Sequence, residues 1–148
     1  MTEFSIDHMV FAVKDLEHSK QFLTKGLKAR FIKELDLPEQ NAKAAYFLLG
    51  ELIIGLETPL SDEGEIYRFL NRKGEGLHHL ALKVESASDV HSQLEGNGVR
   101  IIGDREEHGV RKEFFTHPKS SLGLLLQLIE WEQPYKDSLE KRIEILGK

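Results

Sequence analysis

Two stretches decide the fold because each reads like the other: Ile6-Asp7-His8-Met9-Val10-Phe11-Ala12-Val13 and Leu77-His78-His79-Leu80-Ala81-Leu82-Lys83-Val84. In both, apolar residues alternate with other residues, which is the period-two pattern of a half-buried β-strand. A histidine, His8 or His79, takes the same place in each stretch. The match predicts two copies of one structural unit within the chain.

The segments that follow the two stretches also match. Residues 15–24 and 86–95 carry apolar side chains at helical spacing, and each begins with a residue that favours helix N-caps: Asp15, and Ser86 or Ser88. Each predicted helix stops at a glycine, and three short strands follow. The strands are predicted at 29–32, 44–49 and 52–57 in the first copy and at 99–102, 112–116 and 124–130 in the second.

The two copies are expected to fold together as one α+β domain over residues 1–148. Each β-α-β-β-β module would otherwise leave one face of a curved sheet exposed, and pairing two such faces buries them around a cleft. From Pro134 onward, apolar residues fall on one side of a helix that docks on the protein or on a partner. The expected boundaries are module 1 at about 5–58, a linker with a short helix at 59–76, module 2 at about 77–131 and a helical tail at 134–148.

The composition excludes several classes of function. The chain has 148 residues, a formal net charge of −5 and no cysteine. The net negative charge argues against nucleic-acid and anionic-membrane partners, since both need a basic face, and without cysteine there is no disulfide, thiolate or Cys-ligated metal. No apolar run reaches the roughly 18 residues of a spanning helix, and the N-terminus lacks the basic start of a signal peptide. We expect a cytoplasmic protein.

The repeat places several possible metal ligands at equivalent positions. His8 and His79 lie on the first strands, and Gly55 and Gln127 are equivalent on the last strands. Two imidazoles and an amide oxygen suit a borderline divalent ion such as cobalt, zinc, nickel, manganese or ferrous iron. Three ligands with open positions are typical of a catalytic site. The alternative is that each histidine is an ordinary strand residue with satisfied hydrogen bonds.

Two carboxylates and one further histidine belong to the same strands. Glu57 lies two residues after Gly55 on the same face, and Glu113 has a similar position in the second module. Each is a candidate general base, and Glu57 is also a candidate ligand, although a residue near a strand end is often exposed at the rim. His78 points away from the face of His79 and is expected to be structural. The remaining histidines are expected to be solvated: His18, His91, His108 and His117.

Several motifs resemble one known family. They are Ile6-Asp7-His8 with residues 13–16, Pro59-Leu60, Gly74-Glu75-Gly76-Leu77-His78-His79, His108-Gly109, His117-Pro118-Lys119 and residues 124–128. Together they resemble the vicinal oxygen chelate superfamily (glyoxalase, bleomycin resistance protein and dioxygenase), and within it the methylmalonyl-CoA epimerases most closely. The resemblance implies paired modules that form an open, U-shaped mixed sheet around a divalent metal. In the epimerases the metal chelates two substrate oxygens and stabilises an enolate, while carboxylates move a proton.

The resemblance carries over only in part. His8 and His79 fall on two ligand positions of the family, and Gln127 falls on a third that is normally Glu. Gly55 falls on the fourth ligand position, and Ala44 on the strand position of a catalytic Glu. An amide can coordinate a metal but is not a base, so proton abstraction would pass to Glu57, Glu113 or a metal-bound hydroxide.

Several functions are consistent with these features. The first is a metal-dependent epimerase or isomerase for a small vicinal-oxygen substrate, most like racemisation of methylmalonyl-CoA. A lactoylglutathione lyase-like activity and a non-catalytic protein that binds or sequesters a small molecule are alternatives. An iron dioxygenase ranks last, because Gln127 replaces the carboxylate of its ligand triad. The substrate can be a coenzyme A or glutathione thioester, and a homodimer is expected because the superfamily commonly forms one.

Overall fold

The computed structural model describes residues 3–148, which divide into two compact units. The N-terminal unit comprises His8–His78 with Ile145–Lys148, and the C-terminal unit comprises residues 3–7 with His79–Glu144. Among the described residues, no helix is both long enough and apolar enough to cross a membrane.

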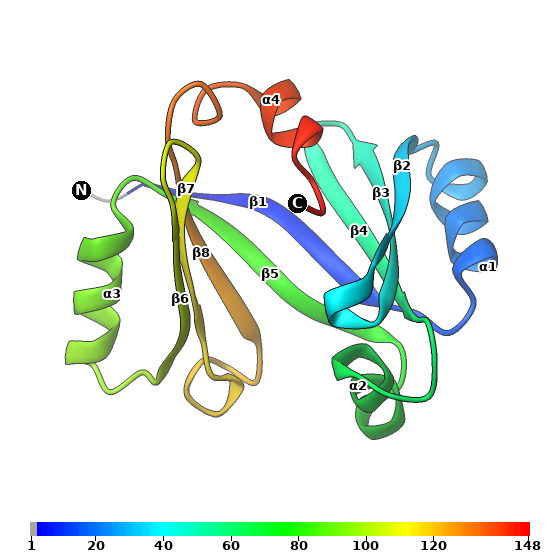
Figure 1. The fold of residues 1–148 in the computed structure, drawn as a ribbon, viewed down its shortest axis with the longest axis horizontal. Helices are drawn as coiled ribbons and strands as arrows, with labels where there is room; N and C mark the ends of the chain where they lie inside the picture. Colours follow the sequence, from blue (N-terminus) through cyan, green and yellow to red (C-terminus); the bar gives the residue numbers. More distant parts are fainter. Residues whose placement is uncertain (1–2) are drawn as a thin grey trace. The chain divides into compact units, whose positions relative to one another are not determined.

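The N-terminal unit contains four strands in the order β2-β3-β4-β1 (Figure 1). β1 pairs with β4 in parallel, and the β4–β3 and β3–β2 pairs are antiparallel. Helix α1, extended by a π-helical turn, follows β1, and α2 follows β4. The bounds are β1 Phe4–Ala12, α1 Leu16–Gln21, the π-helical turn Phe22–Gly26, β2 Arg30–Leu37, a 3₁₀ turn Pro38–Gln40, β3 Ala42–Leu49, β4 Leu52–Pro59 and α2 Glu65–Lys73.

The C-terminal unit repeats this order with strands β5-β8-β7-β6. β5 pairs with β8 in parallel, β8–β7 and β7–β6 are antiparallel, and α3 packs against β6, β7 and β8 (Figure 1). The bounds are β5 Gly76–Val84, α3 Ala87–Gly96, β6 Ile101–Glu107, β7 Arg111–Thr116, a 3₁₀ turn Pro118–Ser120, β8 Leu125–Trp131 and α4 Leu139–Glu144.

The register of the parallel pairs confirms the predicted repeat. In the N-terminal unit His8 is opposite Ile53 and Val10 is opposite Gly55. In the C-terminal unit His79 is opposite Leu125 and Ala81 is opposite Gln127. Each unit therefore has its histidine two residues before the residue opposite Gly55 or Gln127. The predicted α+β fold of two β-α-β-β-β modules is confirmed.

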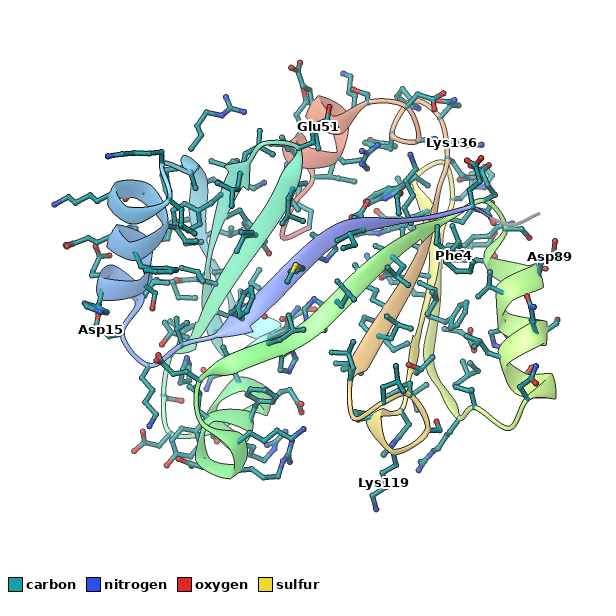
Figure 2. All side chains as sticks on the ribbon, turned by 180° about the vertical axis from the view of Figure 1, so that it is seen from behind. Phe4, Asp15, Glu51, Asp89, Lys119 and Lys136 are labelled. Carbon is teal, nitrogen blue, oxygen red and sulfur yellow. The ribbon has the colours of Figure 1, made fainter. Side chains whose placement is uncertain are left out.

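The predicted helix starts are also confirmed. The Asp15 carboxylate accepts a hydrogen bond from the His18 backbone N–H at 3.0 Å, and Ser86 Oγ accepts one from the Asp89 N–H at 3.2 Å. Side-chain oxygens at these positions satisfy backbone N–H groups that have no partner within the helix. Figure 2 labels Asp15 where α1 begins and Asp89 in the first turn of α3. Of the two serines considered as caps, Ser86 has the role.

Two strands are longer than predicted. β2 continues to Leu37 because its charged residues pair with those of β3: Asp36 is opposite Lys43, and their side chains form a 2.8 Å ion pair. In the same way β6 runs to Glu107, with Arg105 opposite Glu113. In both strands a register shift interrupts the alternation, between Phe31 and Lys33 in β2 and between Ile102 and Arg105 in β6, so the short pattern ended before the strand did. Cross-strand charge pairs stabilise the extensions.

One face of the sheet in each unit is covered by a helix of that unit. Leu16 and Leu23 pack with Phe47 and Leu56 in the N-terminal unit, and Val90 packs with Phe114 in the C-terminal unit. The opposite face of each sheet is therefore the one that carries the candidate site residues.

The tail helix is tied to its own unit by polar contacts. Arg142 donates to the backbone oxygens of Tyr135 at 2.6 Å and Lys136 at 3.0 Å, and its Nε lies 3.7 Å from Asp7. Asp7 also accepts a 2.8 Å hydrogen bond from the Trp131 indole. The tail therefore docks on the protein, as predicted, and one of its contacts is the buried carboxylate of Asp7, the residue before His8.

Candidate active site

A buried carboxyl group lies on the strand face of His8. Because β1 and β4 are parallel and in register, His8 and Ala12 share a face with Gly55 and Glu57. Glu57 is only 5% exposed. Burial raises the pKa of its carboxyl group from 4.5 to about 7, and the charge of His8 opposes this shift. A carboxyl group with such a pKa can both accept and release a proton near neutral pH.

A tyrosine ring covers Gly55. Tyr46 on β3 is directly opposite Gly55 on β4. A Cβ atom added to Gly55 would lie 3.0 Å from Val10 Cγ2 and 3.1 Å from Tyr46 Cε1, which is closer than ordinary packing allows. Ala44, two residues before Tyr46, is opposite Glu57. The Tyr46 ring therefore fills the space that a side chain at residue 55 would occupy.

His78 packs inside the N-terminal unit. It is buried, its ring contacts Phe69 edge-on with centroids 5.1 Å apart, and its Nε2 lies 3.6 Å from a carboxylate oxygen of Glu65. Burial lowers the pKa of His78, and Glu65 partly offsets that effect. A ring nitrogen of His78 also lies within 4.8 Å of a Glu57 carboxylate oxygen. Sequence reasoning missed this last contact, because period-two alternation says nothing about residues on separate strands.

The C-terminal unit holds the other three candidate residues. Gln127 and Glu113 are both buried, and Gln127 Nε2 donates a 2.8 Å hydrogen bond to Glu113 Oε2. Glu113 Oε1 lies 3.4 Å from Arg105 Nη1, so both carboxylate oxygens have partners. His79 on β5 faces Phe115, with ring centroids 6.4 Å apart. The predicted ligand Gln127 and the predicted base Glu113 are thus direct partners.

This hydrogen bond sets the direction of the Gln127 amide. A carboxylate only accepts hydrogen bonds, so the amide must turn its NH₂ group toward Glu113. The carbonyl oxygen Oε1 then points away from Glu113. Only this oxygen of the amide is suited to coordinate a metal.

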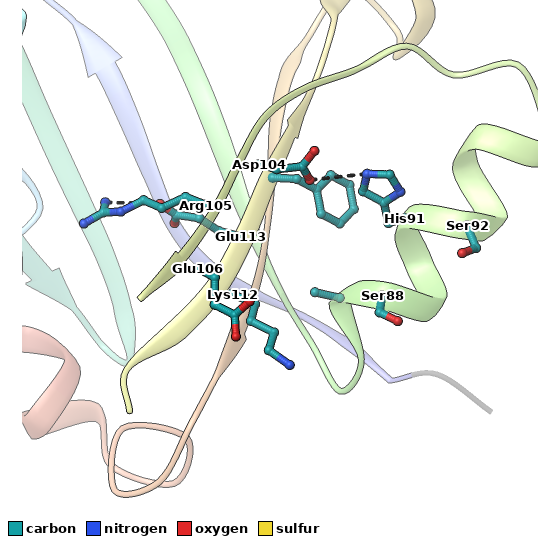
Figure 3. Close-up of a pocket in the computed structure, with 10 residues that line it drawn as sticks. Ser88, His91, Ser92, Asp104, Arg105, Glu106, Lys112 and Glu113 are labelled. Atoms are coloured by element: carbon teal, nitrogen blue, oxygen red, sulfur yellow. Dashed lines mark hydrogen bonds and ion pairs between the residues drawn. The ribbon is translucent and has the colours of Figure 1, made fainter. Parts of the chain in front are cut away.

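His91 and His117 have defined partners instead of being simply solvated. His91 lies 3.0 Å from Glu95 and 3.3 Å from Asp104, and it packs edge-on against Phe114 beside a cavity of about 370 Å³. Figure 3 shows Arg105 and Glu113 on the other side of the β6–β7 pair from His91 and Asp104. His117 Nδ1 accepts a hydrogen bond from the Lys119 N–H and caps a 3₁₀ turn.

Comparison with known proteins identifies the family. The sequence profile of the Glyoxalase/Bleomycin resistance protein/Dioxygenase superfamily matches residues 5–126, which include module 1 and most of module 2. The chain belongs to this superfamily.

Methylmalonyl-CoA epimerases are among the proteins to which this chain is similar. The mouse mitochondrial epimerase is 29% identical over 83% of this chain and 71% of its own length. The Mycobacterium tuberculosis epimerase structure is 27% identical, with a TM-score of 0.72 and coverage of 88% of this chain and 89% of that chain. A hypothetical protein from Bacillus halodurans C-125, BH1468, is 32% identical with a TM-score of 0.76, covering 86% and 94%.

The donor atoms in the superfamily member fit a borderline divalent ion. One relative, 31% identical over 77% of this chain and 70% of its own length, is the metallothiol transferase FosB of Staphylococcus saprophyticus. Imidazole nitrogens, an oriented amide oxygen and a buried carboxyl group are ligands that such ions accept.

Proposed function

We propose that this protein is a divalent-metal-dependent epimerase that acts on a small acyl-CoA thioester of the methylmalonyl-CoA type. The observation that carries the proposal is the matched register of the two parallel strand pairs, with one histidine at the equivalent position of each. The proposal is also supported by the relatives of this protein, because the similarity to methylmalonyl-CoA epimerases extends over most of the chain. In the cell we expect a cytoplasmic homodimer.

The proposed metal ligands are His8, His79 and Gln127. Gln127 would offer Oε1, since its NH₂ group is held by Glu113. When bound, a divalent ion supplies positive charge that polarises a thioester carbonyl and stabilises the negative oxygen of an enolate. The ion can be cobalt, zinc, nickel, manganese or iron, because two nitrogens and one oxygen suit all of them.

Glu57 is the proposed proton carrier. It is buried on the strand face of His8, and burial favours the exchange of a proton near neutral pH. The carboxylate would take the proton from the carbon next to the carbonyl, and delivery of a proton to the opposite face of the enolate by a second acid would invert that carbon. Glu113 is the second candidate, but its contacts with Gln127 and Arg105 support first a role in holding the amide.

A non-catalytic small-molecule binding protein is the second candidate function. It is favoured by Ala44 and Gly55, which have no side chain able to accept a proton or bind a metal. A lactoylglutathione lyase-like activity is a further alternative within the same chemistry, because it also proceeds through an enolate.

Metal analysis of tag-free protein tests the proposal. We expect about one bound divalent ion per chain, and loss of that ion in His8→Ala and in His79→Ala. His18→Ala removes an exposed histidine and is the matched control. Equal metal content in all four proteins would contradict the proposed ligands.

Activity then separates the candidate functions. We expect the metal-loaded protein to exchange the α-proton of methylmalonyl-CoA with deuterium from the solvent. Metal-loaded protein that binds the thioester but exchanges no proton would favour the binding protein. Turnover of a hemithioacetal alone would favour the lyase.

A further inference from the structure

Tyr46 is a buried polar residue that the proposed function has not yet used. Its side chain is 7% exposed and lies on the same face of the N-terminal unit as Glu57. Along β3 and β4, Tyr46 is opposite Gly55 and Ala44 is opposite Glu57, so Tyr46 and Glu57 are diagonal neighbours. In antiparallel pairs, diagonal neighbours are within reach of a long aromatic side chain.

Gly55 is what allows the ring to lie there. A Cβ atom at residue 55 would come within 3.1 Å of Tyr46 Cε1 and 3.3 Å of Cδ1. Any larger side chain at 55 would push the ring aside, and any smaller one at 46 would leave a hole. The small residue and the large residue are therefore complementary across the two strands.

The phenol of Tyr46 is a hydrogen-bond donor at physiological pH. Burial raises the pKa of Tyr46 well above its usual range, and the nearby charge of Glu57 adds to the effect. The hydroxyl group consequently keeps its proton beside a group that exchanges one. Preorganised donors of this kind stabilise the oxygen on which negative charge develops during a reaction.

We propose that Tyr46 binds the substrate oxygen that becomes negative, donating its phenolic O–H while Glu57 removes the proton from the adjacent carbon. This inference rests on the proposed function. In the step, the C–H bond breaks and the proton goes to the Glu57 carboxylate. The electron pair forms a C=C bond, and the carbonyl π electrons move to the oxygen that Tyr46 contacts. Return of the proton to carbon restores both groups.

The test compares a coenzyme A ligand whose acyl part is negative and enolate-like with a coenzyme A ligand whose acyl part is uncharged. The probes are 2-nitronate-propionyl-CoA, a ligand of Streptomyces coelicolor methylmalonyl-CoA epimerase, and propionyl-CoA. We expect Tyr46→Phe to bind the nitronate about tenfold more weakly, the loss typical of one hydrogen bond to a charged group, and propionyl-CoA within about twofold of wild type. Metal content should not change. Tyr67→Phe, the same chemical change at a half-buried tyrosine on α2, is the control and should leave both affinities unchanged.

A second pair of variants tests the role of Gly55. Gly55→Leu, which adds bulk without a metal-binding atom, should displace the ring and weaken nitronate binding as Tyr46→Phe does, while Tyr46→Phe combined with Gly55→Leu should lose little more. Full nitronate affinity in Tyr46→Phe, or equal losses for both probes, would overturn the assignment of Tyr46. Failure of the wild-type protein to bind either metal or nitronate would instead overturn the proposed function itself, and the inference with it.

Discussion

At the scale of single residues, the site depends on how each polar group is buried and held. Glu57 is buried on the strand face that also carries His8, whereas Glu113 is buried and its two carboxylate oxygens contact Gln127 and Arg105. Two carboxylates that look alike in the sequence therefore have different chemistry. The chemistry of neither carboxylate follows from its residue type, because neighbouring residues on other strands determine it.

The raised pKa of Glu57 predicts a pH-dependent stability. The carboxyl group binds its proton more tightly in the folded protein than in the unfolded chain. Its contribution is therefore favourable at acidic pH and is lost as pH rises from about 4.5 to about 7. Relative to Glu57→Gln, the metal-free wild type should lose about 2 kcal/mol of unfolding free energy between pH 5 and pH 8. Urea unfolding with a chelator at both pH values measures this, and parallel pH profiles for the two proteins would contradict it.

The Gln127–Glu113 contact predicts a charge effect. Gln127→Glu replaces a 2.8 Å hydrogen bond with two facing carboxylates, so the metal-free variant should lose about 1–3 kcal/mol of stability. Adding Glu113→Gln restores one donor and one acceptor in reversed order and should recover most of the loss. Thermal or urea unfolding of the single and double variants gives the coupling energy. Additive losses would show that the two side chains do not interact.

At the scale of secondary-structure elements, local sequence determines where helices begin, whereas contacts between strands determine how far strands extend. The caps of α1 and α3 are local and were predicted from short sequence patterns. The extension of β2 and β6 depends on charge pairs with the neighbouring strand, which no short pattern contains. The fit of Gly55 to Tyr46 also joins two strands.

The start of α3 predicts different effects for two nearby serines. Ser86→Ala removes the acceptor for the Asp89 N–H and should cost about 1 kcal/mol of unfolding free energy. Ser88 is exposed within the helix, so Ser88→Ala should change stability by less than about 0.5 kcal/mol. Chemical denaturation of the two variants makes the comparison. A larger effect at Ser88 would place the cap there instead.

The β3–β4 pair predicts a context-dependent cost for a methyl group. Gly55→Ala brings a Cβ atom to 3.0 Å from Val10 and 3.1 Å from Tyr46 and should destabilise the protein by about 1–3 kcal/mol. In a Tyr46→Ala background one of the two close contacts is gone, so the same change should cost clearly less. Unfolding curves of the four proteins measure the difference, and an equal cost in both backgrounds would contradict the packing argument.

At the scale of the whole molecule, the chain is a duplicated β-α-β-β-β module whose two copies keep the same strand register. Membership of the superfamily accounts for this arrangement.

Metal binding at the proposed ligands should stabilise the folded protein. A divalent ion at about 100 times its dissociation constant should add about 2.7 kcal/mol to the unfolding free energy, because it binds the folded state only. We expect the increase in wild type and in His18→Ala, and its loss in His8→Ala and His79→Ala. Differential scanning fluorimetry with and without the ion measures it. A stabilisation that survives both histidine substitutions would point to other ligands.

The sequence by itself determined the repeat, the helix starts and two pairs of equivalent positions, His8 with His79 and Gly55 with Gln127. These features depend on alternation and capping over a few neighbouring residues, and such local preferences can be recognised in the sequence alone. Only the tertiary structure decided that Tyr46 covers Gly55, that Glu113 holds Gln127 and that Glu57 is buried. Those features depend on residues of different strands, and they arise only when strand register brings the side chains to one face.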